Sequence, residues 1–235
     1  MSSAKLILTC EHGGNQIPKE YDHLFKHAKP DLESHKGYDI GALEVFNVLR
    51  NQDYCAYSNF SVISRLLIEL NRSLHHPSLF SKYTKHLGAK TKTTIIANFY
   101  EPYRNSVEEK IKSMIEDNFS VIHISVHSFT PVLNGENRNA DVGLLYDPKR
   151  MPEKRICYSW KIELKHLAPE LNIRMNYPYK GTADGFVTFL RKKYKQYYCG
   201  IELEMNQSHF SKGENNLTTV ISNSLNNLTP LLGEW

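Results

Sequence analysis

Apolar residues recur along the chain in two patterns, short continuous runs and longer stretches with helical spacing. Buried strands produce the first pattern and amphipathic helices the second. The short runs cover residues 6–8, 60–63, 66–70, 121–127, 141–146 and 198–205, and the helical spacing covers residues 39–49, 106–117, 152–167, 186–194 and 215–228. Strands that alternate with helices, without repeats or linkers, predict a single α/β domain over residues 1–235. We expect a mainly parallel, mixed sheet flanked by helices.

Two histidines follow or end strongly predicted strands. His12 comes after the run at residues 6–8 and precedes Gly13 and Gly14, which allow a sharp turn, and His127 closes the run at residues 121–127. The carboxyl ends of parallel strands meet at one edge of a sheet, where open α/β folds bind ligands. Two histidines and one carboxylate form a zinc site that leaves a position for water. An ordinary loop histidine would explain His12 alone equally well, so the pair carries the metal hypothesis.

Three residues compete to be the third metal ligand. Glu11 neighbours His12 and would have to turn to the same side, while Asn15 is a poor ligand for zinc. Asp39 is our choice, although it also stands where a helix beginning at that residue would have its N-cap.

Two carboxylates lie on one face of the last predicted strand. Glu202 and Glu204 are two residues apart, so their side chains point the same way. Burying two carboxylates together is costly unless a metal, an arginine or water compensates. One of them beside a metal-bound water could serve as the general base. Alternatively, the two residues lie on an edge strand whose charged face meets solvent.

Several polar residues near the ends of predicted elements could bind a substrate. Arg72 and Arg104 could hold a carboxylate through two parallel hydrogen bonds. Asn71, Tyr103 and Ser128 could add hydrogen bonds. Each of these residues could instead solvate a surface or pack.

Charge and composition exclude some partners. The chain has 29 lysines and arginines against 25 acidic residues, a formal net charge of +4, without a concentrated basic tract. Nucleic-acid binding usually needs such a tract, so we expect no nucleic-acid partner and a small anionic substrate instead. No apolar stretch reaches the roughly 18 residues needed to span a bilayer, and no signal peptide is visible, so we expect a cytoplasmic protein without a membrane partner. The oligomeric state stays open.

An ordered set of motifs resembles one known family. The set is CEHGGN, GYDIGA, LNR, YEPYR, SVHSF, NYPYKG and IELEMNQ, and it extends from about Leu6 to Phe210. This order is similar to that of the N-formylglutamate amidohydrolase family, whose fold is like that of zinc carboxypeptidases and aspartoacylases. The resemblance implies an enzyme with one zinc ion that hydrolyses N-formyl-L-glutamate to formate and L-glutamate. It also implies a role in histidine degradation.

The resemblance also implies roles for individual residues. The zinc histidines would be His12 and His127, and the pair Asn71–Arg72 would bind the substrate carboxylate. Alignment through the Glu-Met-Asn-Gln end of the last motif makes Glu204 the general base, whereas alignment through Ile201-Glu202 makes it Glu202.

Two positions depart from the pattern of the wider group. Asn15 stands where an acidic ligand is expected, which leads us to infer Asp39 in its place. Arg104 stands where relatives often have a histidine, and an arginine there could suit a second carboxylate, such as the side chain of formylglutamate. Two alternatives are a zinc hydrolase of other N-acyl amino acids or short peptides, and a non-catalytic binding protein for an anionic metabolite.

Overall fold

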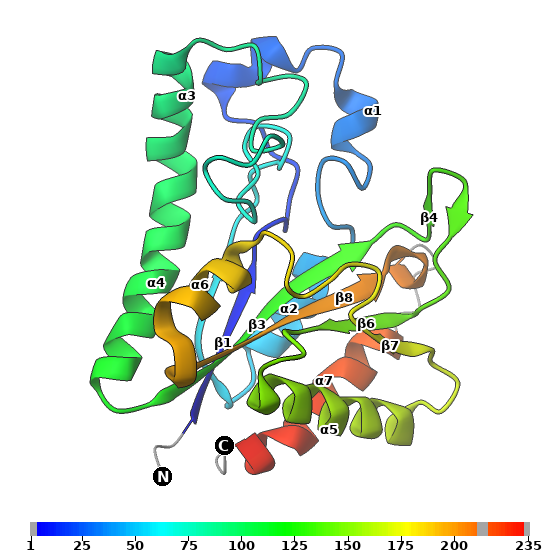
Figure 1. The fold of residues 1–235 in the computed structure, drawn as a ribbon. Coiled ribbons are helices and arrows are strands. Elements are labelled where there is room, and N and C mark those ends of the chain that lie inside the picture. The colour runs from blue at the N-terminus through cyan, green and yellow to red at the C-terminus, as the bar shows by residue number, and fades with distance from the viewer. Residues whose placement is uncertain (1–3, 211–215, 233–235) are drawn as a thin grey trace.

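A six-stranded sheet forms the centre of the computed structural model, which describes residues 4–210 and 216–232 (Figure 1). Its strand order is β2-β1-β3-β8-β6-β7. The bounds are Cys55–Phe60 for β2, Ala4–Cys10 for β1, Ser120–Phe129 for β3, Tyr198–Asn206 for β8, Val142–Leu145 for β6 and Ile173–Met175 for β7. The first four strands are parallel, β6 is antiparallel to β8, and β7 is parallel to β6. The predicted α/β class with a mainly parallel, mixed sheet is confirmed.

Helices cover both faces of the sheet. Successive residues of β1 enter different hydrophobic clusters, since Leu6 and Leu8 belong to one and Ile7 to the other. The first cluster contains α2 (Ala42–Arg50), α5 (Met151–Leu167) and α7 (Asn216–Leu232), and the second contains α4 (Glu101–Glu116) and α6 (Phe186–Tyr194). Among the described residues, no helix combines the length and the apolar character that a membrane crossing requires.

Short elements complete the chain between these helices and strands. They are α1 (Lys29–Leu32), α3 (Ala89–Ile95), a π-helical turn (Ile96–Tyr100), the hairpin β4 (Val132–Leu133) and β5 (Glu136–Asn137), and the 3-10 helices Lys19–Leu24, Lys195–Tyr197 and Gln207–Phe210. Most of them lie in the layer above the carboxyl ends of the parallel strands (Figure 1).

The segment at residues 61–70 differs from its prediction. We expected strands at residues 60–63 and 66–70, but β2 ends at Phe60 and the backbone beyond it turns repeatedly. Its apolar side chains are still buried, among them Leu67 and Ile68. An apolar run without a distinct period indicates burial and does not specify the backbone conformation.

Two predicted helix starts also move. The helix after Asp39 begins only at Ala42, behind Gly41 with φ 84°, so Asp39 is not its N-cap and its side chain is available for other contacts. α4 begins at Glu101, five residues before the predicted start, and it continues directly from α3 and the π-helical turn, so residues 89–116 form one continuous helical stretch (Figure 1).

The topology places a crevice above β1 and β3. From β1 the chain continues to β2 on one side, while β3 lies on the other side. Such a change of direction opens a crevice outside the carboxyl ends of the strands, where α/β proteins bind ligands. Glu11 and His12 follow β1, and His127 lies two residues before the end of β3, so all three reach this crevice.

Candidate active site

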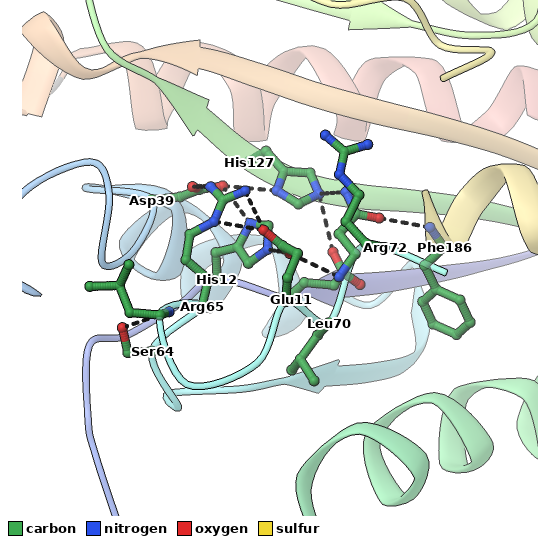
Figure 2. Close-up of polar contacts among 12 residues, drawn as sticks. Glu11, His12, Asp39, Ser64, Arg65, Leu70, Arg72, His127 and Phe186 are labelled. Atoms are coloured by element: carbon green, nitrogen blue, oxygen red, sulfur yellow. Dashed lines mark hydrogen bonds and ion pairs between the residues drawn. The ribbon is translucent and has the colours of Figure 1, made fainter. Parts of the chain in front are cut away.

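Three of the predicted residues converge at the edge of the sheet (Figure 2). Asp39 Oδ2 lies 3.2 Å from His12 Nδ1 and 2.8 Å from His127 Nδ1. The two imidazole rings are 5.1 Å apart between centroids, and all three side chains are buried. The structure thus brings together His12, Asp39 and His127 as one group with the ligand types of a metal site.

The turn after β1 holds His12 in place. A Cβ atom on Gly13 would lie 2.9 Å from the carbonyl oxygen of Ser61, and one on Gly14 would lie 2.6 Å from that of Val62. Only glycine allows this close approach, and the Gly13 N–H donates to Ser61 O at 3.0 Å. The backbone N–H of Asp39 donates to His12 O at 2.9 Å, which fixes these two residues relative to each other.

Glu69 and Arg65 hold the far side of His12, and the sequence reasoning missed both. Glu69 Oε1 is hydrogen-bonded to His12 Nε2. Arg65 donates from Nε to Glu69 Oε2 at 2.8 Å and from Nη1 to Asp39 Oδ1 at 3.1 Å. Together with the contact between His12 and Asp39, these hydrogen bonds join the four side chains into a closed ring. A glutamate inside the apolar run at residues 66–70, next to the LNR motif, was the available signal.

Glu11 holds the far side of His127. Its Oε2 lies 3.2 Å from His127 Nε2 and accepts a 2.5 Å hydrogen bond from Ser125 Oγ, which itself is 2.8 Å from His127 Nε2. Tyr103 donates its hydroxyl to Glu11 Oε1 at 2.9 Å. Of the three candidates for the third ligand, Asp39 faces the Nδ1 atoms and Glu11 supports a histidine from behind. The side-chain amide of Asn15 donates to Leu32 O at 3.0 Å.

The charges of this group favour a cation between its side chains. Burial opposes ionisation, but the histidines and Arg65 lower the pKa of Asp39 and Glu69, and His127 and Ser125 lower the pKa of Glu11, well below the ordinary values. Burial also disfavours a charged imidazole, yet these carboxylates raise the pKa of His12 and of His127. With both imidazoles neutral, as metal ligands require, three carboxylates against the single guanidinium leave two net negative charges, which a divalent ion would balance in place of the two protons.

The hydrogen bonds also fit a metal ion. Both nitrogens of each histidine lie against a carboxylate, Nε2 against Glu69 or Glu11 and Nδ1 against Asp39 Oδ2. Without a metal, protons on both nitrogens satisfy these contacts, whereas with the proton on Nε2 alone both Nδ1 lone pairs face the same carboxylate oxygen and can share a cation with it. Carboxylates behind the ligating histidines are common in metal sites, where they orient the rings. Two imidazoles and one carboxylate form a donor set that zinc accepts.

A cavity of about 150 Å³ opens beside the group, and both candidate bases line it. Glu204 lies opposite His127 in the β3–β8 register, and its Oε2 is buried without a hydrogen-bond partner among the described residues. Burial, with Asp39 and Glu202 nearby, raises the pKa of Glu204 to about 8. Glu202 lies opposite Ser125 and accepts a 3.3 Å hydrogen bond from Asn71 Nδ2. The free oxygen favours Glu204 as the reactive carboxylate.

Three of the predicted substrate-binding residues line the same cavity. Asn71 is fixed by a 2.7 Å hydrogen bond from the Phe186 N–H to its Oδ1. Arg72 donates from Nη1 to the backbone oxygen of Asp184. Ser128 donates from Oγ to Ile40 O at 2.7 Å. These contacts hold the three side chains at the wall of the cavity, together with Lys180, which the sequence reasoning did not identify.

The structure does not bring the other two predicted substrate-binding residues into this cavity. Tyr103 is buried behind Glu11. Arg104 lines a neighbouring cavity, and its Nη1 donates to the backbone oxygens of Leu70 and Arg72 at 3.1 Å and 3.3 Å. Both residues support the segments that carry the candidate site.

Known structures share this fold. A gene product of Agrobacterium tumefaciens has a TM-score of 0.80 at 22% identity, over 97% of this chain and 90% of that chain. The N-formylglutamate amidohydrolase from Ralstonia eutropha JMP134 has a TM-score of 0.70 at 15% identity, over 100% of this chain and 94% of that chain. A search of curated protein sequences gives no match.

A comparison with family profiles gives more information about this chain than the similar structures do. At such identities the two structures show the fold alone. The profile of the N-formylglutamate amidohydrolase family, by contrast, matches residues 4–211 and so spans the candidate ligands, the LNR motif and both glutamates of β8. The chain is therefore an amidohydrolase that belongs to the N-formylglutamate amidohydrolase family.

Proposed function

We propose that the protein is a metal-dependent hydrolase that cleaves the N-acyl amide of an acidic N-acyl amino acid, with N-formyl-L-glutamate as substrate and formate and L-glutamate as products. One observation carries this proposal: the group formed by His12, Asp39 and His127 lies beside the partnerless oxygen of Glu204 in a small cavity. The family match supports the reaction class. The role in histidine degradation rests on the family resemblance alone and stays a prediction.

The metal in this proposal is one zinc ion. His12 Nδ1, Asp39 Oδ2 and His127 Nδ1 would hold it. When bound, zinc acts as a Lewis acid toward the carbonyl and lowers the pKa of water. Glu69 and Glu11 orient the two histidines from behind, which keeps both Nδ1 atoms directed at the same point.

Glu204 moves the proton in the proposed reaction. Its carboxylate accepts a proton from the attacking water, the water oxygen bonds to the formyl carbon, and the same carboxyl group returns the proton to the nitrogen as the C–N bond breaks. The pKa of Glu204, about 8 when no cation is nearby, lies close to neutral pH. A cation at the neighbouring ligands favours the ionised form that a base requires.

The cavity suits a small anionic substrate. Its volume of about 150 Å³ fits an acylated amino acid better than a long peptide. Arg72 and Asn71 lie at its wall, where they anchor the α-carboxylate in this proposal. The ammonium group of Lys180 makes no ion pair or hydrogen bond with any residue in the described part of the chain, so it is available for the distal carboxylate.

The first test measures release of L-glutamate from N-formyl-L-glutamate by the purified protein as isolated, after chelation, and after zinc is restored. We expect activity that is lost with the chelator and returns with zinc. Turnover that survives complete metal removal would contradict the metal dependence. Turnover of N-acetyl amino acids or dipeptides in place of formylglutamate would change the substrate class, and zinc binding without turnover of any acyl amino acid would favour the binding-protein alternative.

The second test separates the two glutamates of β8. We expect Glu204→Gln to lower kcat about 10²- to 10⁴-fold, the usual contribution of a positioned general base, while zinc content is retained. Glu202→Gln is the matched control on the same strand, and we expect it to retain most of the turnover. The reverse result, with an active Glu204→Gln and an inactive Glu202→Gln, would assign the base to Glu202.

A further inference from the structure

A second cavity, of about 390 Å³, lies between α4 and α6 and is larger than the cavity at the candidate active site. In Figure 1 these helices lie on the same side of the sheet. Asp184 lines both cavities, and its Oδ2 accepts hydrogen bonds from Ser73 N at 3.0 Å and Ser73 Oγ at 3.2 Å. This contact forms part of the wall between the two cavities.

Arg104 lines the second cavity and lacks a counter-ion. Its side chain is only 6% exposed, and the guanidinium carbon lies 4.1 Å from the ring centroid of Phe186 and 5.1 Å from that of Phe189. Nη1 donates to two backbone oxygens, but Nε and Nη2 make no hydrogen bond or ion pair with any described residue. A buried charge is costly unless it is paired. The equally buried Arg191 is paired, because its Nε donates to Glu153 Oε1 at 3.0 Å.

The other walls of the cavity are apolar on one side and acidic at the rim. Leu74 and Phe189 are large apolar side chains that are 49% and 42% exposed, and both line the cavity. The charged side chains that also line it are Glu101, Glu108, Asp184, Lys192 and His75, and Glu108 forms an ion pair with Lys193. An apolar wall beside Nε and Nη2 of the buried guanidinium suits a ligand that has a single negative charge, while the three carboxylates repel a second one.

We propose that the cavity between α4 and α6 is a second ligand site, which binds a small monocarboxylate with an apolar or aromatic body. The carboxylate accepts hydrogen bonds from Nε and Nη2 of Arg104, and the apolar body packs on Leu74 and Phe189. This site is distinct from the cavity beside His12 and does not depend on the proposed reaction.

The position of Arg104 also links this site to the candidate active site. The carbonyls that accept from Arg104 Nη1 belong to Leu70 and Arg72, which flank Asn71. A ligand on the same guanidinium is therefore linked, through the side chain of Arg104, to the segment that presents Asn71 and Arg72 to the other cavity. If the proposed function holds, ligand binding changes the KM for formylglutamate more than kcat, since this segment binds substrate and carries no reacting group.

The test uses 3-phenylpropionate as the probe and its neutral amide, 3-phenylpropionamide, as the matched control compound. Binding is followed by NMR titration of the ¹⁵N-labelled protein, which needs no turnover. We expect the acid to bind at least about tenfold more tightly than the amide, because hydrogen bonds to charged groups contribute about 1.5–3 kcal/mol. The affected amides should belong to the α4 and α6 residues around the cavity, including Asn105 and Thr188.

Two variants locate the binding site. We expect Arg104→Met to weaken binding of the acid at least tenfold, whereas Arg155→Met, at an exposed arginine of α5, leaves it unchanged. Asn105→Trp fills the cavity from the exposed surface of α4 and keeps Arg104, so it decides the question if Arg104→Met does not fold.

Three results would overturn the second site. They are equal affinity for acid and amide, binding that survives Asn105→Trp, and shifts centred on Ser128 and Lys180 that saturating N-formylglutamate abolishes. A protein that fails to hydrolyse formylglutamate but binds phenylpropionate as described would contradict the proposed function and leave this site intact.

Discussion

His123 and His127 lie four residues apart on β3, both are buried, and they have opposite electrostatic environments. His123 lies between the hydroxyls of Thr9, at 2.7 Å, and Tyr198, at 2.6 Å, and burial lowers its pKa to about 4. Burial acts in the same direction on His127, but its carboxylate partners raise its pKa above the ordinary value. The partners of each ring, and not its depth in the sheet, decide which histidine is suited to binding a cation.

The origin of those partners explains the difference. Thr9 and Tyr198 belong to the neighbouring strands β1 and β8, so His123 is surrounded by the sheet itself. Glu11 and Asp39, which contact His127, lie outside the strands, since Glu11 follows β1 directly and Asp39 lies in the irregular backbone just before α2. At His123 the strand β3 therefore has a structural role. The candidate active site lies four residues further on, at His127, where irregular backbone segments bring carboxylates to the carboxyl end of the strand.

The largest expected effect comes from making the surroundings of His127 neutral like those of His123. We expect Glu11→Gln to weaken zinc binding about 10- to 100-fold, the usual result of losing a carboxylate behind a ligating histidine. Competition with a chromophoric chelator measures this affinity without reference to turnover. The matched control is Glu170→Gln at an exposed position. Equal zinc affinities of the two variants would show that Glu11 does not support the metal site.

An intermediate effect should appear in the pH dependence of stability. The folded-state pKa of His123, about 4, lies below the unfolded value of about 6.5, so the unfolded chain binds more protons and stability falls as pH decreases through this window. Between pH 7.5 and 5.5 we expect the metal-free protein to lose about 1 kcal/mol more than the His123→Gln variant. Urea unfolding of both proteins at both pH values measures this difference, and parallel losses would show that His123 does not carry it.

The smallest expected effect on zinc binding concerns the hydroxyl behind Glu11. Tyr103→Phe removes the 2.9 Å hydrogen bond to the ionised carboxylate of Glu11, and we expect it to cost about 1.5–3 kcal/mol of stability. Because Tyr103 does not contact His127, zinc affinity should change less than about twofold. Urea unfolding and the chelator competition measure the two quantities. A tenfold loss of zinc affinity would extend the functional network to Tyr103.

The regular helices and strands were predicted well from the sequence, because their apolar residues repeat with a clear pattern over many positions. The helix at Phe186–Tyr194 matches its prediction at both ends, and β3 differs by only one or two residues. Strand ends and glycines were enough to select His12 and His127, because parallel strands bring distant residues to one edge.

The features that the sequence did not predict lie in segments whose apolar residues show no regular spacing. Glu69 and Arg65 reach the site because residues 61–70 turn, and an apolar run does not reveal such turns. The earlier start of α4 places Arg104 inside the continuous helical stretch of α3, the π-helical turn and α4, and its side chain faces the cavity with α6. A π-helical turn shifts which side of the helix the following residues face, and the sequence pattern did not reveal this turn.

The place of β8 in the sheet has a consequence for biosynthesis. It is the last strand to be made, yet it lies between β3 and β6, and it carries Glu204. Until β8 has left the ribosome, β3 lacks one of its two neighbours, and parallel pairing of segments distant in sequence is slow. A nascent chain therefore contains His12, Asp39 and His127 long before Glu204, so the side chains proposed to bind the metal precede the carboxylate proposed to activate water.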